Sequence, residues 1–225
     1  AVPSPFDFGR QTVVAIPSDL PGFGDDEASA TVIRDVATAS GGGIFALFTS
    51  YRSLRGVADR LRRAGIDGRW PLFVQGEGQR AQLVRRFTEC GNGILLGVAS
   101  FWEGVDVPGD PLRGLVIAKL PFRVPTEPLT AARMEALEQD GGSGFFRYML
   151  PHAALRLKQG FGRLIRSTTD RGAVVILDDR LLKKSYGRYF LDSLPPAPLR
   201  KGPWEELRAG LGEFYTGRAL RGLEP

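Results

Sequence analysis

The two residue types that most often build disulfides and metal sites are nearly absent from this chain of 225 residues. It has one cysteine, Cys90, and one histidine, His152. A single cysteine excludes a disulfide within the chain, and it also excludes a cysteine cluster for zinc or an iron–sulfur centre. A single histidine leaves too few ligands for a histidine-based metal site. We therefore expect no metal site built from this chain alone.

Long hydrophobic runs are also missing. No apolar run approaches the roughly 20 residues that a membrane-spanning helix needs, and the first residues do not have the pattern of a signal peptide. We therefore expect no membrane contact and a cytoplasmic location. The composition, with 43% hydrophobic and 24% charged residues, is typical of a globular protein with a buried core, in one large domain or two small ones.

Positive charge is in excess, and arginine supplies most of it. The formal net charge is +5, the sequence pI is about 9.6, and 25 of the 30 basic residues are arginine. This balance favours a polyanionic partner, either nucleic acid or a nucleotide, although many unrelated enzymes have a similar net charge.

Short apolar runs alternate with helical patterns along most of the chain. The runs expected to form strands are 12–16, at an edge of the sheet, and 44–48, 72–74, 93–99, 115–118 and 173–177. The residues expected on the buried faces of the first three helices are Ala28, Val32, Val36 and Ala39, then Leu54, Val57, Ala58 and Leu61, then Ala81, Val84 and Phe87. Two further helical segments, 130–139 and 145–166, precede the last strand. These repeated units predict an α/β fold with a doubly wound, mostly parallel sheet flanked by helices.

The composition divides the chain into three parts. Residues 1–11 are rich in proline and are expected to connect this chain to a preceding domain. Residues 12–194 carry the strand–helix pattern. Residues 195–225 are expected to form a C-terminal helical tail. It begins with a Pro-rich link at 195–203, which separates short helical patterns at 186–193 and 204–215.

Residues 159–166 form the pattern Gln-x-x-Gly-Arg-x-x-Arg. On a helix, Gln159, Arg163 and Arg166 share one face because they are spaced by four and three residues. Arginine offers planar donors that stay charged, and Gly162 leaves room for close approach, so the pattern suits a triphosphate. A solvated basic helix face has the same spacing. The turn-rich break and the buried strand that follow favour a nucleotide site.

Ligands of open parallel sheets gather beyond the carboxyl ends of the strands, and three of these ends carry polar residues. Thr49, Ser50 and Tyr51 follow the second run. Their hydroxyls and the amides of a helix N-terminus suit a phosphate, although a plain helix cap has the same sequence. Gln75 follows the third run and is a weak signal by itself.

The last of the three polar strand ends is that of the run 93–99, and small, aromatic and acidic residues follow it. Phe101 and Trp102 suit stacking on bases, or packing against a neighbouring domain. Asp106 suits a contact with a ribose hydroxyl, or a cap for the next turn.

The order of these segments resembles the second motor domain of superfamily-two helicases. Thr-Ser-Tyr at 49–51, Ser-Phe-Trp-Glu-Gly-Val-Asp at 100–106 and the pattern at 159–166 occur in the expected sequence. More narrowly, the chain resembles the DinG branch of the XPD/DinG family, which also matches Ser-Pro-Phe-Asp at 4–7 and Leu-Pro-Phe at 120–122. The resemblance covers nearly the whole chain, to about residue 194, and implies a RecA-like fold.

The resemblance also implies ligands and residue roles. Arg163 and Arg166 would contact the γ-phosphate of ATP, with Arg166 as the first choice for the arginine finger, and Gln159 would lie beside the phosphates. The other implied ATP contacts are Glu103, Gly104 and Asp106, and the implied DNA contacts are Thr49, Ser50, Tyr51, Gln75 and Ser100. The implied ligands are ATP with Mg²⁺ and single-stranded DNA, with movement in the 5′-to-3′ direction.

The sequence has neither a phosphate loop of the pattern G-x-x-x-x-G-K-[ST] nor a DEAH-like acidic box. In the family that the chain resembles, both belong to the first motor domain, which also carries the iron–sulfur cysteines where they exist. We therefore expect this chain to be inactive alone. Its expected partner is the N-terminal motor domain of the same protein, which would hold most of the Mg²⁺ ligands, and we expect a monomer.

Two other classes of function remain open. One is a nucleic-acid-binding module without a role in catalysis. The other is a free-standing small-molecule enzyme, which is disfavoured because no glycine-rich fingerprint, catalytic cysteine setting or histidine pair is visible. His152 by itself is interpreted as a capping or packing residue.

Overall fold

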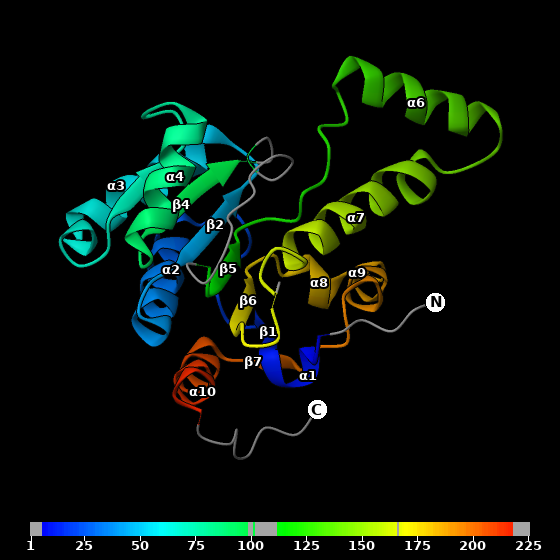
Figure 1. Ribbon diagram of the computed structural model, residues 1–225. Coiled ribbons are helices and arrows are strands. Elements are labelled where there is room, and N and C mark those ends of the chain that lie inside the picture. Colours follow the sequence, from blue (N-terminus) through cyan, green and yellow to red (C-terminus); the bar gives the residue numbers. More distant parts are fainter. Residues whose placement is uncertain (1–5, 99–100, 102–111, 166, 218–225) are drawn as a thin grey trace.

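Seven parallel strands form the sheet at the centre of the computed structural model, which describes residues 6–98, 101, 112–165 and 167–217 (Figure 1). The strands are β1 (Thr12–Pro17), β2 (Ile44–Phe48), β3 (Leu72–Val74), β4 (Ile94–Val98), β5 (Gly114–Ile117), β6 (Gly172–Ile176) and β7 (Leu199–Gly202). Their order across the sheet is β3-β4-β2-β5-β6-β1-β7, and all neighbouring pairs are parallel. The predicted α/β class is confirmed.

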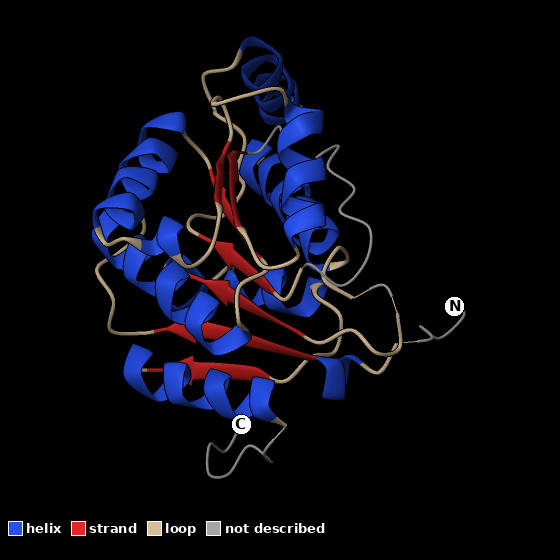
Figure 2. Ribbon diagram, turned by 60° about the vertical axis from the view of Figure 1, so that its left-hand side comes forward, coloured by secondary structure: helices blue, strands red, loops and turns tan. Residues whose placement is uncertain are grey.

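Helices cover both faces of this sheet (Figure 2). They are α1 (Phe8–Gln11), α2 (Asp26–Ser40), α3 (Tyr51–Arg63), α4 (Arg80–Cys90), α6 (Pro128–Gln139), α7 (Leu150–Phe161), α8 (Arg180–Lys183), α9 (Gly187–Ser193) and α10 (Trp204–Thr216), with a 3₁₀ turn at Ile66–Gly68 and a π-helix, η2, at Phe145–Met149. Helices α2, α3 and α10 pack on one face, and α4, α7 and α9 pack on the other. None of the helices in the described residues is both long and apolar enough to cross a membrane.

The sheet separates two hydrophobic cores, and each strand contributes to both because successive side chains point to opposite faces of the sheet. In β1, Val13 and Ala15 face the α2–α3–α10 side, whereas Val14 and Ile16 face the α4–α7 side. All residues of β1, β2, β4, β5 and β6 are buried. Continuous apolar runs are typical of parallel strands because helices cover both faces of the sheet.

Short polar caps and glycines fix the helices on either side of β2. The Asp25 carboxylate accepts a hydrogen bond from the Ala28 backbone N–H at 2.8 Å, and Gly41, with φ of 73°, ends α2 in the left-handed region. The Ser50 hydroxyl accepts a hydrogen bond from the Ser53 backbone N–H at 3.3 Å at the start of α3. The four residues predicted on the buried face of α3, Leu54, Val57, Ala58 and Leu61, are all buried. On α2, Val32 and Val36 are buried, whereas Ala28 and Ala39 are only partly so.

The buried face of α4 is displaced from the predicted one. Leu83 and Phe87 are its buried residues, while Ala81 is exposed and Val84 is partly buried. Ala81 and Val84 are three residues apart and Leu83 and Phe87 are four apart, so either pair can lie on one face of a helix. The Leu83 side chain is larger and contributes more apolar area to the core than Ala81 does. The helix therefore turns its Leu83–Phe87 face to the sheet.

Two strand assignments at the far end of the sheet differ from the predictions. β1 is not an edge strand, because it lies between β6 and β7. β7 forms within the predicted Pro-rich link, where only helices were expected on either side. Its sequence, Leu-Arg-Lys-Gly, has no apolar run, and each of its residues is partly or fully exposed. This strand exists because its backbone pairs with β1, a contact that the local sequence does not encode.

The chain after β7 is joined to the rest of the domain by several polar contacts. The Trp204 backbone N–H donates to Asp19 at 2.8 Å, and its indole N–H donates to Asp35 at 3.0 Å. The Tyr215 hydroxyl donates to the Arg113 carbonyl at 2.5 Å and accepts from the Ala173 backbone N–H at 3.0 Å. Burial of that hydroxyl raises the pKa of Tyr215 above its ordinary range. Helix α10 is therefore a packed element of the domain.

Candidate nucleotide and nucleic-acid sites

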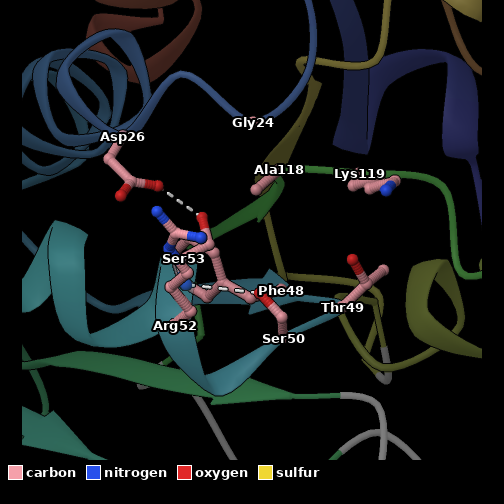
Figure 3. Close-up of a pocket in the computed structure, with 9 residues that line it drawn as sticks. All are labelled: Gly24, Asp26, Phe48, Thr49, Ser50, Arg52, Ser53, Ala118 and Lys119. Atoms are coloured by element: carbon pink, nitrogen blue, oxygen red, sulfur yellow. Dashed lines mark hydrogen bonds between the residues drawn. The ribbon is translucent and has the colours of Figure 1, made fainter.

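The carboxyl ends of β2 and β5 open into a pocket of about 310 Å³, shown in Figure 3. Thr49 and Ser50 follow β2, and Ala118 and Lys119 follow β5. The other lining residues are Gly24, Asp26, Phe48, Arg52 and Ser53. Because β2 and β5 are neighbours in the sheet, residues about 70 positions apart in sequence lie on one wall. Two of the predicted DNA contacts, Thr49 and Ser50, line this pocket.

The electrostatics of this pocket favour an anion. It lies at the N-terminus of α3, where backbone amides and the helix dipole attract negative charge. Arg52 and Lys119 add two positive charges. The acidic lining residue, Asp26, accepts a hydrogen bond from the Ser53 hydroxyl at 2.5 Å and lies 3.8 Å from Arg60. Its charge is therefore partly compensated from outside the pocket.

Tyr51 and Gln75 contact each other, but neither of them lines this pocket. The Gln75 side-chain amide donates to the Tyr51 hydroxyl at 2.7 Å, and its oxygen accepts from the Val98 backbone N–H at 2.7 Å. Gln75 thus fixes the Tyr51 ring to the end of β4. The ring is 44% exposed, which leaves it accessible to a ligand.

Phe101 is a core residue. It is 1% exposed, and a Cβ atom added at Gly97 would approach its side chain to 2.8 Å. Stacking of Phe101 on bases is therefore wrong, because no face of the ring is open. The other residues predicted from this segment, Ser100, Trp102, Glu103, Gly104 and Asp106, lie outside the described residues, and their roles stay predictions.

The helix that carries the Gln-x-x-Gly-Arg pattern ends sooner than predicted. The π-helix η2 leads directly into α7, and α7 stops at Phe161. Arg163 lies in the following turn, where its backbone N–H donates to the Gly160 carbonyl at 3.1 Å. A single helical face extending from Gln159 past Arg163 is therefore wrong. Leu164 and Ile165, next along the chain, are buried, so packing against the sheet ends the helix here; Arg166 lies outside the described residues.

Gln159 and Arg163 nevertheless line one pocket of about 560 Å³ along α7. The other lining residues are Arg123, His152, Leu155, Arg156 and Gly162. His152, Arg156 and Gln159 are spaced by four and three residues, so they follow one another along the same face of α7. Arg156 was not among the predicted site residues, although the same spacing rule places it one turn before Gln159. Arg123 was not predicted either, because no local sequence pattern connects it to α7.

The imidazole of His152 contacts an aromatic ring and also lines the α7 pocket. Its ring packs edge-on against Tyr148, with 4.6 Å between ring centroids, so the predicted packing role is confirmed, and it also lines the pocket. Burial, followed by the charges of Arg123, Arg156 and Arg133, lowers the pKa of His152. At neutral pH the imidazole is therefore uncharged, and the positive charge of the pocket comes from arginine.

The connection that follows β5 is fixed by a buried carboxylate. Asp178 is 0% exposed and accepts a hydrogen bond from the Leu120 backbone N–H at 2.8 Å. It also accepts two hydrogen bonds from the Arg180 guanidinium, at 2.8 and 2.6 Å. That guanidinium lies over the rings of Phe23 and Phe122, 4.2 and 5.2 Å from their centroids. This cluster holds residues 119–123, which reach both pockets.

Gln11, from the predicted connector, holds the turn at residues 167–170. Its side-chain amide donates to the Ser167 carbonyl at 2.8 Å and to the Asp170 carbonyl at 3.0 Å. Within the turn, the Ser167 backbone N–H donates to the Asp170 carboxylate at 2.9 Å. The segment directly after Arg166 in sequence is therefore attached to the start of β1.

Gly162 has no conformational reason to be glycine. Its φ of −63° is accessible to any residue, and an added Cβ would make only ordinary contacts, 3.6 and 3.7 Å from backbone oxygens. Gly162→Ala is therefore expected to leave stability unchanged or raise it by about 0.4–1 kcal/mol. If ATP binds along this wall, as the family resemblance implies, the methyl group displaces its phosphates, and ATP hydrolysis by the full-length protein is expected to fall about 10- to 100-fold.

The matched control for this variant is Gly210→Ala in α10, where an added Cβ meets nothing within 4 Å. Urea unfolding and steady-state ATP hydrolysis measured on both variants separate the two effects. Unchanged hydrolysis by Gly162→Ala would mean that no ligand approaches this part of the pocket.

An all-parallel sheet covered by helices on both faces, with pockets at the carboxyl end of β2 and along α7, is the architecture of a RecA-like α/β domain. More narrowly, the chain belongs to the helicase C-terminal domain family, whose model matches residues 33–197, and its resemblance to the DinG branch is confirmed by two relatives. It is 44% identical over 200 residues to the ATP-dependent DNA helicase YoaA of Escherichia coli K12, covering 88% of this chain and 31% of that protein. It is 38% identical over 199 residues to the ATP-dependent helicase DinG of Mycobacterium tuberculosis H37Rv, covering 87% of this chain and 30% of that protein. The chain thus spans about a third of the length of these curated relatives.

Solved structures agree on the fold. An XPD helicase superposes with a TM-score of 0.61 at 19% identity, covering 85% of this chain and 35% of that chain. The C-terminal domain of the DEAD-box protein Dbp5 gives a TM-score of 0.57 at 14% identity, covering 92% of this chain and 98% of that chain. At such low identity the likeness shows the fold alone, and that fold is the predicted RecA-like one.

Proposed function

We propose that this chain is the second motor domain of an ATP-dependent DNA helicase, in which it supplies arginine contacts to the γ-phosphate and part of the track for single-stranded DNA. The observation that carries the proposal is the pocket that joins Gln159, Gly162 and Arg163. Three residues of the Gln-x-x-Gly-Arg pattern face one cavity although the helix ends between them.

The nucleotide side of the proposal assigns ATP to a cleft between this domain and the N-terminal motor domain of the same protein. Arg163 and Arg166 bind the γ-phosphate across that cleft, with Arg166 as the arginine finger, and Gln159 orients the phosphates. Guanidinium groups suit this role because they offer paired donors and stay charged. Glu103, Gly104 and Asp106 contribute further contacts to the nucleotide.

Magnesium is assigned to the other motor domain. In the residues that the structure describes, no group of three or more histidine, cysteine, aspartate or glutamate side chains is placed to hold a metal ion. Bound Mg²⁺ would neutralise phosphate charge during hydrolysis. An iron–sulfur cluster, where the full-length protein has one, is likewise assigned to the N-terminal part.

The DNA side of the proposal uses the pocket between β2 and β5. Thr49 and Ser50 donate hydroxyl hydrogen bonds to a backbone phosphate at the α3 N-terminus, with support from Lys119. Tyr51, held by Gln75, lies beside the same strand, and Ser100 extends the contact. As Arg163 and Arg166 bind and release the γ-phosphate, this domain moves relative to its partner, and the hydroxyl contacts advance along the DNA in the 5′-to-3′ direction. The protein works as a cytoplasmic monomer.

The experiment that tests this proposal compares ATP turnover by residues 1–225 with turnover by the full-length protein, each with and without single-stranded DNA. The chain alone is expected to show no turnover above background, because it lacks a phosphate loop lysine. The full-length protein is expected to hydrolyse ATP faster when DNA is present. Robust turnover by the chain alone would overturn the two-domain mechanism.

A further inference from the structure

Arg123 brings a guanidinium to the α7 pocket from a different part of the fold. It follows β5 on the connection to α6, which passes beside α7 (Figure 1). Its Nε atom is buried and has no hydrogen-bond partner among the described residues. A buried donor without an acceptor is unfavourable and uncommon in folded proteins. The missing acceptor points to a ligand that enters the pocket.

The backbone that presents Arg123 is held in place. The Leu120 backbone N–H donates to the buried carboxylate of Asp178 at 2.8 Å. The Phe122 ring packs against Phe145 and Phe190, with centroid distances of 5.7 and 5.5 Å. Arg123 is therefore presented from a fixed loop, which lowers the entropy lost when its guanidinium binds a ligand.

The charge of the pocket selects an anion. None of its lining residues is acidic, and three of them are arginines: Arg123, Arg156 and Arg163. The lining imidazole of His152 is uncharged at neutral pH, because burial and these neighbouring cations disfavour its protonation. Guanidinium groups bind phosphate oxygens through two parallel N–H donors. Oxyanions with several phosphate groups are the ligands that best fit three such groups in one cavity.

The size and position of the pocket indicate which phosphates bind. At about 560 Å³ it is in the usual range for a small-molecule site, and it contains Gln159 and Arg163. We propose that Arg123 is a further nucleotide-binding residue, which contacts the phosphate chain of ATP from the β5–α6 connection while Gln159 and Arg163 contact it from α7. This inference rests on the proposed function, and it adds a contact outside the Gln-x-x-Gly-Arg pattern.

The test uses the full-length protein and three variants: Arg123→Ala, Arg123→Lys and Arg163→Ala. Steady-state hydrolysis gives KM and kcat for ATP, calorimetry gives the affinity for a non-hydrolysable ATP analogue, and a fluorescent oligo(dT) gives the affinity for single-stranded DNA. Arg123→Ala is expected to raise KM and weaken analogue binding about 10- to 100-fold. Arg123→Lys is expected to recover only part of the loss, because lysine keeps the charge but not the planar pair of donors. DNA affinity is expected to stay within twofold.

The matched control is Arg133→Ala, which removes an exposed guanidinium that acts on His152 but does not line the pocket. It is expected to leave KM unchanged, and circular dichroism checks that every variant is folded. A KM within twofold of the unsubstituted value for Arg123→Ala overturns the inference, as does a loss of DNA affinity in place of nucleotide affinity. If Arg163→Ala loses hydrolysis while Arg123→Ala leaves KM and the affinity for the ATP analogue unchanged, only this inference fails. If Arg163→Ala hydrolyses ATP normally, the proposed function fails.

Discussion

Arg163→Ala in the full-length protein is expected to lower kcat for ATP hydrolysis by about 10³–10⁵, the range found when an arginine that stabilises the transferring phosphoryl group is absent. Arg166→Ala is expected to lose at least as much. Binding of single-stranded DNA is expected to stay within twofold, because Arg163 lines the α7 pocket and not the pocket between β2 and β5. Arg163→Lys is expected to remain impaired because it loses the paired donors.

The matched control for this prediction is Lys158→Ala. Lys158 is exposed on the same helix and does not line the pocket, so its loss changes the net charge equally without touching the site. Hydrolysis and DNA binding measured side by side distinguish the two classes of function. A module that only binds nucleic acid would show the opposite result, with weaker DNA binding by Arg163→Ala and unchanged hydrolysis.

Arg180→Ala is expected to have the largest effect on stability, a loss of about 3–5 kcal/mol in the free energy of unfolding. The substitution leaves the carboxylate of Asp178, which is 0% exposed, without its charged partner. Burial alone would lower the pKa of Arg180, but the hydrogen bonds and charge of Asp178 outweigh it and raise that pKa. Urea unfolding followed by circular dichroism measures the loss.

A double variant checks the cause of this loss. Asp178→Asn combined with Arg180→Met removes both charges and keeps an oxygen for the Leu120 backbone N–H, so it is expected to recover most of the stability. Asp179→Asn is the surface control, because it breaks the 2.8 Å pair with Lys183, whose side chain is 69% exposed, and leaves the hydrogen bonds between Asp178 and Arg180 in place; it is expected to cost less than about 1 kcal/mol. Equal losses for Arg180→Ala and Asp179→Asn would contradict the assignment.

The part of the candidate site that the sequence predicted consists of segments whose signals are local. Thr49 and Ser50 follow an apolar run, and their position at a pocket results from the parallel sheet that such runs build. Gln159 and Arg163 lie four residues apart, and they share a pocket even though α7 ends at Phe161. In both cases the residues that must meet are neighbours in sequence, so short-range geometry is enough to bring them together.

Residues that meet only through the fold were not predictable in this way. Arg123 lies 40 residues before Arg163, and its place in the pocket depends on the path of the connection from β5 to α6. Gln11 was assigned to a connector, yet its side chain bonds the turn at 167–170 because β1 pairs with β6. β7 has no apolar run, and its strand geometry comes from β1.

The sequence by itself determined the class of the protein: alternating apolar runs required a parallel sheet covered by helices, and the Gln-x-x-Gly-Arg pattern placed arginine next to it. Only the tertiary structure decided where the basic helix ends, which residues of other elements share its pocket, and that Phe101 belongs to the core. The physical reason is that hydrophobic periodicity and capping act over a few residues, whereas burial and charge pairing depend on segments that come together only when the chain folds.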